Sequence, residues 1–220
     1  MKVYKPNIVQ DLEAFYGPLL YSYQQYPKVV DHLNQLALRM WEGVQVGYPA
    51  VFSEFNNYNK NYLGVPIGQL MNKALRIEDC YETVAHQYGF SSWEQLQTHK
   101  QLTYDIPFEQ AVNYLLSGQK AKLQELLDKF PYLISATSKY GHQATILHYT
   151  ASNGVEFWRQ KVPYNLVDLT KLLLEKGADK NALLNVYGGD CTLIGLLETS
   201  AHPYQVGITQ ELKQLLETWI

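Results

Sequence analysis

The chain is short of the features that mark secreted and membrane-spanning proteins. Its 220 residues include only two cysteines, Cys80 and Cys191, whereas small secreted scaffolds usually carry several pairs. No run approaches the roughly 18 apolar residues that a membrane helix needs, and Met1 to Leu12 has no apolar core of signal-peptide length. We therefore expect free thiols, a cytoplasmic location and no membrane partner.

Charge of one sign is also scarce. The formal net charge is -3, acidic and basic residues are interspersed, and no basic stripe with interleaved aromatic residues occurs. Because phosphate contacts need clustered Lys and Arg, we expect no nucleic-acid partner. Tyrosine, by contrast, is abundant at 18 residues. Its apolar ring and polar hydroxyl suit half-buried surfaces and interfaces.

The patterns of metal, phosphate and nucleophile sites are missing as well. The sequence has no Cys-x-x-Cys motif and no two histidines at four-residue helical spacing. Gly188-Gly189 lacks the preceding strand and following helix of a phosphate loop. Cys191 would need a nearby base to act as a nucleophile, and His148 is the one alternative that stays open for that role. We predict no catalytic residue, no metal and no cofactor, and hence a non-enzymatic protein.

Apolar residues recur at helical spacing through the C-terminal half. The predicted helices form pairs, each helix with one apolar face that its pair cannot bury alone, so the pairs are expected to stack. The predicted pairs are Phe108–Leu116 with Leu123–Leu127, Ile146–Asn153 with Leu166–Glu175, and Leu193–Ser200 with Ile208–Trp219.

The N-terminal half is also predicted to be helical, but less regularly. Two helical hairpins are expected within residues 1–100, formed by Val29–Trp41 with Gly47–Phe55 and by Glu78–Tyr88 with Ser92–Lys100, and separated by a loop at Asn56–Gly68. Ser91 or Ser92 is the expected N-cap of the last helix, with Glu94 or Gln95 three residues later as in a capping box.

Several segments together resemble one known family. Thr145-Ile146-Leu147-His148, then Ala151 and Gly154, and later Leu172–Ala182 follow the order of an ankyrin repeat. The match extends to segments elsewhere in the chain, and on these residues the sequence resembles a family of prokaryotic ankyrin-repeat proteins. The further segments are Tyr88–Trp93 with Leu96, Gly141–Tyr149 with Asn153–Glu156, Gly177–Asp179 with Tyr187–Gly189, and Ser200–Pro203.

The resemblance implies an all-α fold, namely an ankyrin-repeat solenoid with a helical N-terminal extension. Residues 101–220 would hold the repeats, at about 105–135, 136–182 and 183–220, with an insertion at 155–165 and a smaller one around His202–Gly207. Ile146 stands where the pattern has Pro, and Gly195 stands where the third repeat should have His, so the last repeat is expected to be a degenerate cap. The resemblance also gives His148 a structural role, joining a helix start to the next turn, while Asp179 and Asn181 satisfy turn backbone.

Two groups of residues are candidates for binding a partner. The first is the insertion, which concentrates residue types enriched at interface hot spots; the alternative is that its aromatic rings fold back over the helix pair. The second is the set of turn residues that would line the concave face of an ankyrin stack, for which plain solvent exposure is the alternative. The insertion candidates are Phe157, Trp158, Arg159, Lys161 and Tyr164, and the turn candidates are Lys139, Tyr140, His142, Asn185, Tyr187 and Asp190.

The function predicted from these observations is that of a protein–protein interaction module with a protein partner. One alternative is an enzyme or small-ligand protein with a pocket between the repeats and an aromatic N-terminal cluster, whose members could equally form core. Another is self-association through Trp219 and Ile220, so the chain is expected to be a monomer or a weak homodimer. The aromatic cluster consists of Trp41, Tyr48, Phe52, Phe55, Tyr58 and Tyr62.

Overall fold

The computed structural model describes residues 2–219, which form two compact units. The N-terminal unit contains Asn7–Tyr104 and Lys139–Gly141, and the C-terminal unit contains the described residues up to Pro6, Asp105–Ser138 and everything from His142 on. Most of the chain is helical, as predicted. The sequence-based division at residue 100 did not foresee that the first residues and the segment 139–141 each belong to the unit of the other half of the chain.

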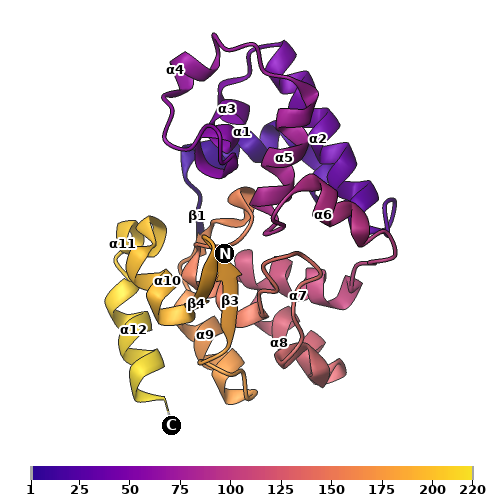
Figure 1. Ribbon diagram of the computed structural model, residues 1–220. Helices are drawn as coiled ribbons and strands as arrows, with labels where there is room; N and C mark the ends of the chain where they lie inside the picture. Colours follow the sequence, from indigo (N-terminus) through magenta and orange to yellow (C-terminus); the bar gives the residue numbers. More distant parts are fainter. Residues whose placement is uncertain (1, 220) are drawn as a thin grey trace. The chain divides into compact units, whose positions relative to one another are not determined.

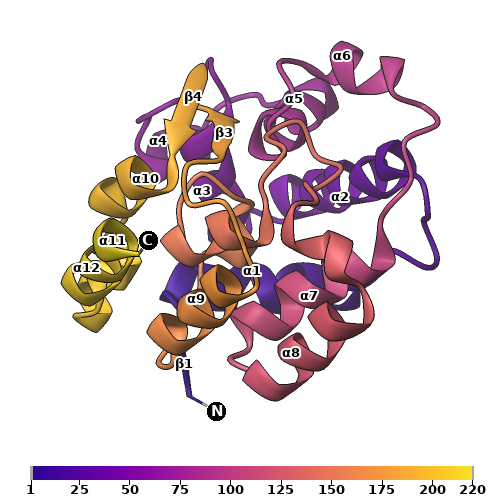
Figure 2. The same ribbon diagram turned by 90° about the horizontal axis from the view of Figure 1, so that it is seen from below.

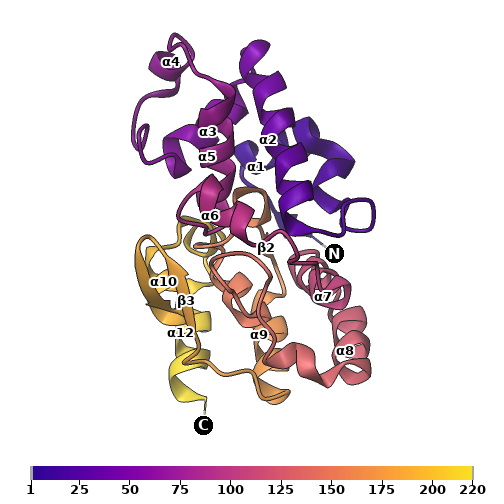
Figure 3. The same cartoon turned by 45° about the vertical axis from the view of Figure 1, so that its right-hand side comes forward.

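The N-terminal unit is built from helices packed around one apolar core. The long helix α2 contacts α5, and α5 also packs against α3 and α6, while α1 contacts both α2 and α3 (Figure 3). At one crossing the helices approach closely, because a Cβ on Gly43 would lie 2.6 Å from Val51 Cγ2. The elements are α1 (Asn7–Tyr16), η1 (Gly17–Tyr21), α2 (Val29–Gln45), α3 (Pro49–Tyr58), α4 (Ile67–Leu70), α5 (Ile77–Gln87) and α6 (Trp93–Thr98).

The start of α6 confirms Ser92 as the predicted N-cap, but the reciprocal bond of a capping box goes to Ser91 and not to Ser92. The Ser92 hydroxyl accepts a hydrogen bond from the backbone N–H of Gln95 at 3.0 Å, and the Gln95 side chain accepts one from the N–H of Ser91 at 2.8 Å. The first bond satisfies a donor that the first turn of the helix leaves open, and the second holds the residue before the N-cap. The predicted loop Asn56–Gly68 is shorter than expected, because α3 continues to Tyr58 and α4 begins at Ile67.

In the C-terminal unit the helical elements contact one another in chain order. The first members of the predicted pairs form one row, α7 against η3 and η3 against α10. The second members form another, α8 against α9 and α9 against α12 (Figure 1). The elements are α7 (Ile106–Leu116), α8 (Lys120–Lys129), η2 (Pro131–Ile134), η3 (Ile146–Ala151), η4 (Phe157–Arg159), α9 (Leu166–Glu175), α10 (Leu193–Thr199), α11 (Ala201–Val206) and α12 (Thr209–Thr218).

The core of this unit lies between the two rows. Leu115, Leu123, Leu173 and Leu196 are among the apolar side chains buried in a single cluster there. Helix α9 has the bounds predicted for it, but the predicted helix Ile146–Asn153 is a 3-10 helix that ends at Ala151. The smaller predicted insertion around His202–Gly207 contains the short helix α11.

Two small antiparallel sheets complete the C-terminal unit, and an all-α description does not include them. Strand β1 (Val3–Tyr4) pairs with β2 (Val162–Pro163), and β3 (Leu183–Val186) pairs with β4 (Gly189–Thr192) as a hairpin (Figure 2). The described residues include no helix long and apolar enough to cross a membrane.

Candidate partner-binding surface

The β3–β4 hairpin is held to its unit by alternate side chains. Leu184 is buried in the core, whereas Leu183 and Asn185 on either side of it are exposed. This alternation follows from the strand period of two, which sends neighbouring side chains to opposite faces. One face of the hairpin is therefore anchored in the core, and the other is exposed to solvent.

The turn of the hairpin carries an exposed tyrosine in a strained backbone conformation. Tyr187 has φ 56° and Gly188 has φ 84°. Two positive φ angles at the two loop residues are the requirement of a type I′ turn, which Gly and Asn satisfy best. A bulky residue there is an outlier that costs of order 1 kcal/mol or more and points to a functional constraint. The Tyr187 side chain is 72% exposed.

A neighbouring loop fixes the direction of the Tyr187 ring. Its hydroxyl donates a 2.6 Å hydrogen bond to Asn153 Oδ1, which also accepts from the N–H of Gly154 at 2.9 Å. The Asn153 amide in turn donates to Thr199 Oγ1 at 3.1 Å. Gly154 has φ 70°, and a Cβ there would lie 3.0 Å from Leu184. The loop therefore brings Asn153 to the hairpin by an approach that needs glycine.

The other hairpin candidates are also exposed. The Asn185 amide donates to Asp190 Oδ1 at 3.2 Å across the two strands. The backbone N–H of Asn185 donates to the carbonyl oxygen of His142 at 3.2 Å. Asn185, Tyr187 and Asp190 are all exposed, so the structure brings these three sequence candidates together. We call them, with Leu183, the hairpin face.

His148 has the structural role that the resemblance implied. Its Nδ1 accepts from the N–H of Thr145 at 3.0 Å, which leaves Nε2 to donate to the carbonyl oxygen of Ala182 at 3.0 Å. The ring thus joins the start of η3 to the residue just before β3. Burial of the imidazole lowers its pKa below the ordinary value. Both nitrogens of the ring are engaged in hydrogen bonds, so His148 connects two backbone segments and has no free nitrogen to accept a proton from a substrate.

The insertion does not form the exposed contact loop that the sequence predicted. Phe157, Trp158, Arg159 and Lys161 are all buried, so four of the five insertion candidates are unavailable to a partner. The fifth, Tyr164, is 48% exposed, but the Lys2 ammonium lies over its ring at 4.8 Å from the centroid. The alternative that the aromatic rings fold back is the one that the burial supports.

An ion network explains why the insertion is buried. Arg159 donates to Glu109 Oε2 of α7 at 2.5 Å and to Glu156 Oε1 at 2.9 Å. All three side chains are at most 1% exposed. A buried guanidinium is tolerated only when such carboxylates pair with it. The sequence signal was misread because Arg beside Trp is a pattern of interface hot spots as well as of buried ion pairs.

The two carboxyl groups that share Arg159 differ in acidity. Burial raises the pKa of Glu109 above its ordinary value, against the attraction of Arg159. Burial also acts to raise the pKa of Glu156, but Arg159 and the neighbouring His142 ring lower it below the ordinary value overall. Glu156 Oε2 lies 3.7 Å from His142 Nε2, so this carboxyl group faces a second basic side chain.

Of the three turn candidates that precede η3, one is exposed and two are buried. Lys139 is exposed, whereas Tyr140 and His142 are 2% and 1% exposed. Tyr140 packs edge-on against Tyr88 with ring centroids 4.7 Å apart, and His142 lies beside Glu156 as described above. Tyr140 and His142 are therefore interior residues, which corrects their assignment to a binding surface.

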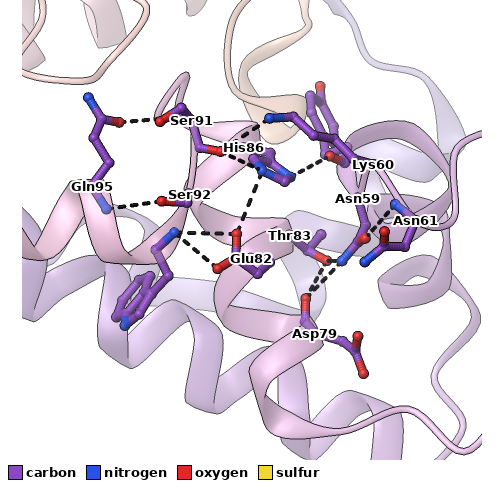
Figure 4. Close-up of polar contacts among 12 residues, drawn as sticks. Asn59, Lys60, Asn61, Asp79, Glu82, Thr83, His86, Ser91, Ser92 and Gln95 are labelled. Atoms are coloured by element: carbon purple, nitrogen blue, oxygen red, sulfur yellow. Dashed lines mark hydrogen bonds and ion pairs between the residues drawn. The ribbon is translucent and has the colours of Figure 1, made fainter.

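A second cluster of polar side chains lies between α5 and α6 (Figure 4). His86 Nδ1 faces the carbonyl oxygen of Tyr58 at 3.2 Å, and Nε2 faces that of Ser91 at 3.0 Å. Glu82 lies 3.6 Å from the same ring and accepts from the N–H of Trp93 at 3.3 Å. Each ring nitrogen faces a backbone carbonyl oxygen, so this cluster links two loops to α5.

The described residues hold little else that resembles a reaction centre. No group of three or more His, Cys, Asp or Glu side chains is arranged to hold a metal among residues 2–219. A depression of about 700 Å³ beside α6, lined by residues including Glu94, His99 and Leu102, is open to solvent. Phe52 and Phe55 of the predicted aromatic cluster are buried core residues.

Sequence reasoning missed two residues of the hairpin site. Asn153 orients the Tyr187 ring, and Leu183 adds an exposed apolar side chain, 54% accessible, next to Asn185. The signal for Asn153 was its position before Gly154, because an Asn-Gly pair marks a tight turn. Comparisons with protein-family models, curated proteins and solved structures found no match to this chain.

Proposed function

We propose that the chain is a protein-binding module that recognises its partner with the hairpin face. The observation that carries this proposal is Tyr187, an exposed aromatic side chain held at a strained turn. Exposed tyrosines on rigid supports are typical anchors of protein interfaces, because they bury a large area at a low cost in side-chain entropy. The hydrogen bond to Asn153 reduces that cost further.

The proposal extends to the architecture around the hairpin. Contacts between elements in chain order, in two rows, support the ankyrin-like stack that the sequence resemblance implies. The link from His148 to Ala182 supports it as well, because it joins one helix pair to the turn before the next. Such stacks present their turns as a preorganised edge, and the hairpin face is an exposed part of that edge.

Both cysteines are free thiols, with Cys80 buried and Cys191 partly exposed. This state supports a reducing compartment, and we propose the cytoplasm as the place where the module acts. Binding is the proposed activity, and the engagement of both ring nitrogens of His148 in structural hydrogen bonds supports this proposal.

The test compares two exposed tyrosines of the same unit. The immobilised full chain and its Tyr187→Ala and Tyr204→Ala variants are each exposed to a native lysate, and the retained proteins are identified. Tyr204 is 78% exposed on α11 and is not part of the hairpin face. A protein retained by the wild type and by Tyr204→Ala, but not by Tyr187→Ala, is the expected partner.

Titration with the purified partner then measures how much each substitution weakens binding. Tyr187→Ala should weaken binding by more than about 1–2 kcal/mol, which is about tenfold or more in Kd. Thermal unfolding of each variant checks that the fold is kept. If every retained protein binds Tyr187→Ala as well as it binds Tyr204→Ala, the hairpin face is not the recognition surface.

A further inference from the structure

Strand β1 is attached to one unit and folded into the other. Residues up to Pro6 belong to the C-terminal unit, while Asn7–Tyr104 belong to the N-terminal unit. Val3 pairs with Pro163 and Tyr4 pairs with Val162 in an antiparallel sheet. The two paired segments are therefore about 160 residues apart in the chain, and only β1 completes the sheet.

The C-terminal unit holds β1 in the way that a peptide-binding domain holds an added strand. The backbone N–H of Tyr164 donates to the carbonyl oxygen of Lys2 at 3.2 Å. The Tyr4 hydroxyl donates to Gln205 Oε1 at 2.6 Å, and the Lys2 ammonium lies over the Tyr164 ring. Main-chain bonds supply affinity and side-chain contacts supply specificity in this mode of recognition. The site thus contacts the side chains of Lys2 and Tyr4 as well as the backbone of β1.

Removal of β1 would expose an apolar edge of the C-terminal unit that a strand of similar sequence can cover. Val162 is 0% exposed and belongs to the core cluster, against which Tyr4 packs. Without β1, this apolar edge and the N–H of Tyr164 would face water. A strand from another molecule with the same residues restores every one of these contacts, which is the reason why exchange of identical elements is a low-cost route to a dimer.

The connection between β1 and α1 is short and has little conformational freedom. Only Lys5 and Pro6 separate Tyr4 from Asn7, and the ring of Pro6 fixes its own φ. A short, stiff hinge favours exchange between copies, because strain in the connection that folds the strand back on its own chain is relieved when the strand pairs with another copy. The balance between self-occupancy and exchange then depends on the hinge and on concentration.

We propose that β2 and the flanking Tyr164 and Gln205 form a strand-receiving site whose second occupant is β1 of another copy of this chain. In the exchanged dimer each C-terminal unit receives Lys2–Tyr4 of its partner, reciprocally, as closed two-fold symmetry requires. The contacts of the site are the same in the monomer and in the dimer, and only Lys5-Pro6 adopts a different path.

The first experiment changes the hinge in the full chain. Deletion of Lys5 shortens the connection, so the dimer fraction measured by light scattering after size-exclusion chromatography should rise above that of the wild type. Insertion of Gly-Ser between Lys5 and Pro6 lengthens it and should keep the chain monomeric. A Lys5 deletion variant that stays folded and monomeric at every concentration overturns the proposal.

A second experiment keeps the hinge intact, because the deletion variant could fail to fold. Tagged and untagged wild-type chains are unfolded together, refolded at increasing total concentration and captured by the tag. Recovery of the untagged chain should grow with concentration and should be lost when both chains carry Val3→Asp with Tyr4→Ala. Recovery that persists in that variant means that the copies pair through another surface, and absence of recovery at all concentrations means that β1 is not exchanged.

Discussion

Arg159 shows how a single buried charge determines the position of a loop. One carboxylate partner, Glu109, lies on α7, and the other, Glu156, immediately precedes η4. The guanidinium therefore bridges two parts of the C-terminal unit. Pairing offsets the cost of removing each charge from water, but it does so only while all three groups are present. Arg159 and its partners therefore lie in the interior together with the buried rings of Phe157 and Trp158.

We predict that Arg159→Ala is strongly destabilising. It leaves Glu109 and Glu156 buried without their shared cation, and loss of one partner of a buried ion pair costs about 3–5 kcal/mol. Lys171→Ala is the matched control, because Lys171 and Glu175 are paired at the surface, and such pairs contribute at most about 1 kcal/mol. Urea unfolding of both variants measures the difference. Equal losses would mean that Arg159 is not an essential part of the core.

At the scale of elements, the β3–β4 hairpin combines a stable anchor with a strained turn. Leu184 fixes one face in the core, and the hydrogen bond of Asn185 N–H to His142 fixes one edge. The turn then places a tyrosine where the backbone favours Gly or Asn. This arrangement exchanges some stability for an aromatic side chain at the tip, which is the pattern expected of a binding element.

Substitutions at the turn should separate backbone strain from loss of the ring. Both Tyr187→Asn and Tyr187→Val remove the hydroxyl that bonds to Asn153, but Asn tolerates a positive φ and the β-branched Val does not. We expect Tyr187→Asn to be more stable than Tyr187→Val by about 1 kcal/mol or more in thermal or urea unfolding. Both should lose partner binding. Equal stabilities would show that the turn relaxes to another conformation.

At the scale of the whole molecule, the dependence of stability on pH should be dominated by buried carboxyl groups. Burial raises the pKa of Glu54 to about 8, against the hydrogen bond from the Tyr16 hydroxyl. The folded state therefore keeps a proton that the unfolded chain releases above its ordinary pKa of about 4.5. The stabilisation is complete below about 4.5 and is lost as pH rises towards about 8.

Glu54→Gln tests this assignment. Gln stays neutral and keeps an acceptor for Tyr16, so the variant should lose the decline in unfolding free energy, which for one group is at most about 1.4 kcal/mol per pH unit. It should therefore gain on the wild type as pH approaches 8. Glu94→Gln, at an exposed position on α6, is the control that should follow the wild-type curve. If the Glu54→Gln curve runs parallel to that of the wild type, Glu54 is ionised in the folded protein.

Much of the helical architecture was predictable, because its signals are local. Leu166–Glu175 was predicted with the bounds of α9, since its apolar stripe ends at Gly177. The cap at Ser92 was predicted from its own neighbours, since Gln95 lies three residues later. In the site, Asn185, Tyr187 and Asp190 were predicted as turn residues of the resembled repeat and do lie together.

The rest depended on partners far away in the chain. Arg159 was predicted to bind a partner because Arg is enriched at interfaces. Its burial could not be foreseen, since Glu109 lies 50 positions earlier and no pattern in the sequence joins the two residues. Strand β1 was not predicted at all, since a two-residue strand has no periodicity of its own and its partner is Val162. The positive φ of Tyr187 could not be predicted from the sequence either, because tyrosine is not one of the residues that favour this backbone conformation.

The interleaved path of the chain has a practical consequence for anyone who wishes to work with half of it. A cut between Tyr104 and Asp105 looks like a natural boundary, yet the first fragment would take β1 away from the unit it completes. The second fragment would take Lys139–Gly141 from the other unit. Neither fragment would contain a whole fold, so assays of isolated halves would report on damaged proteins.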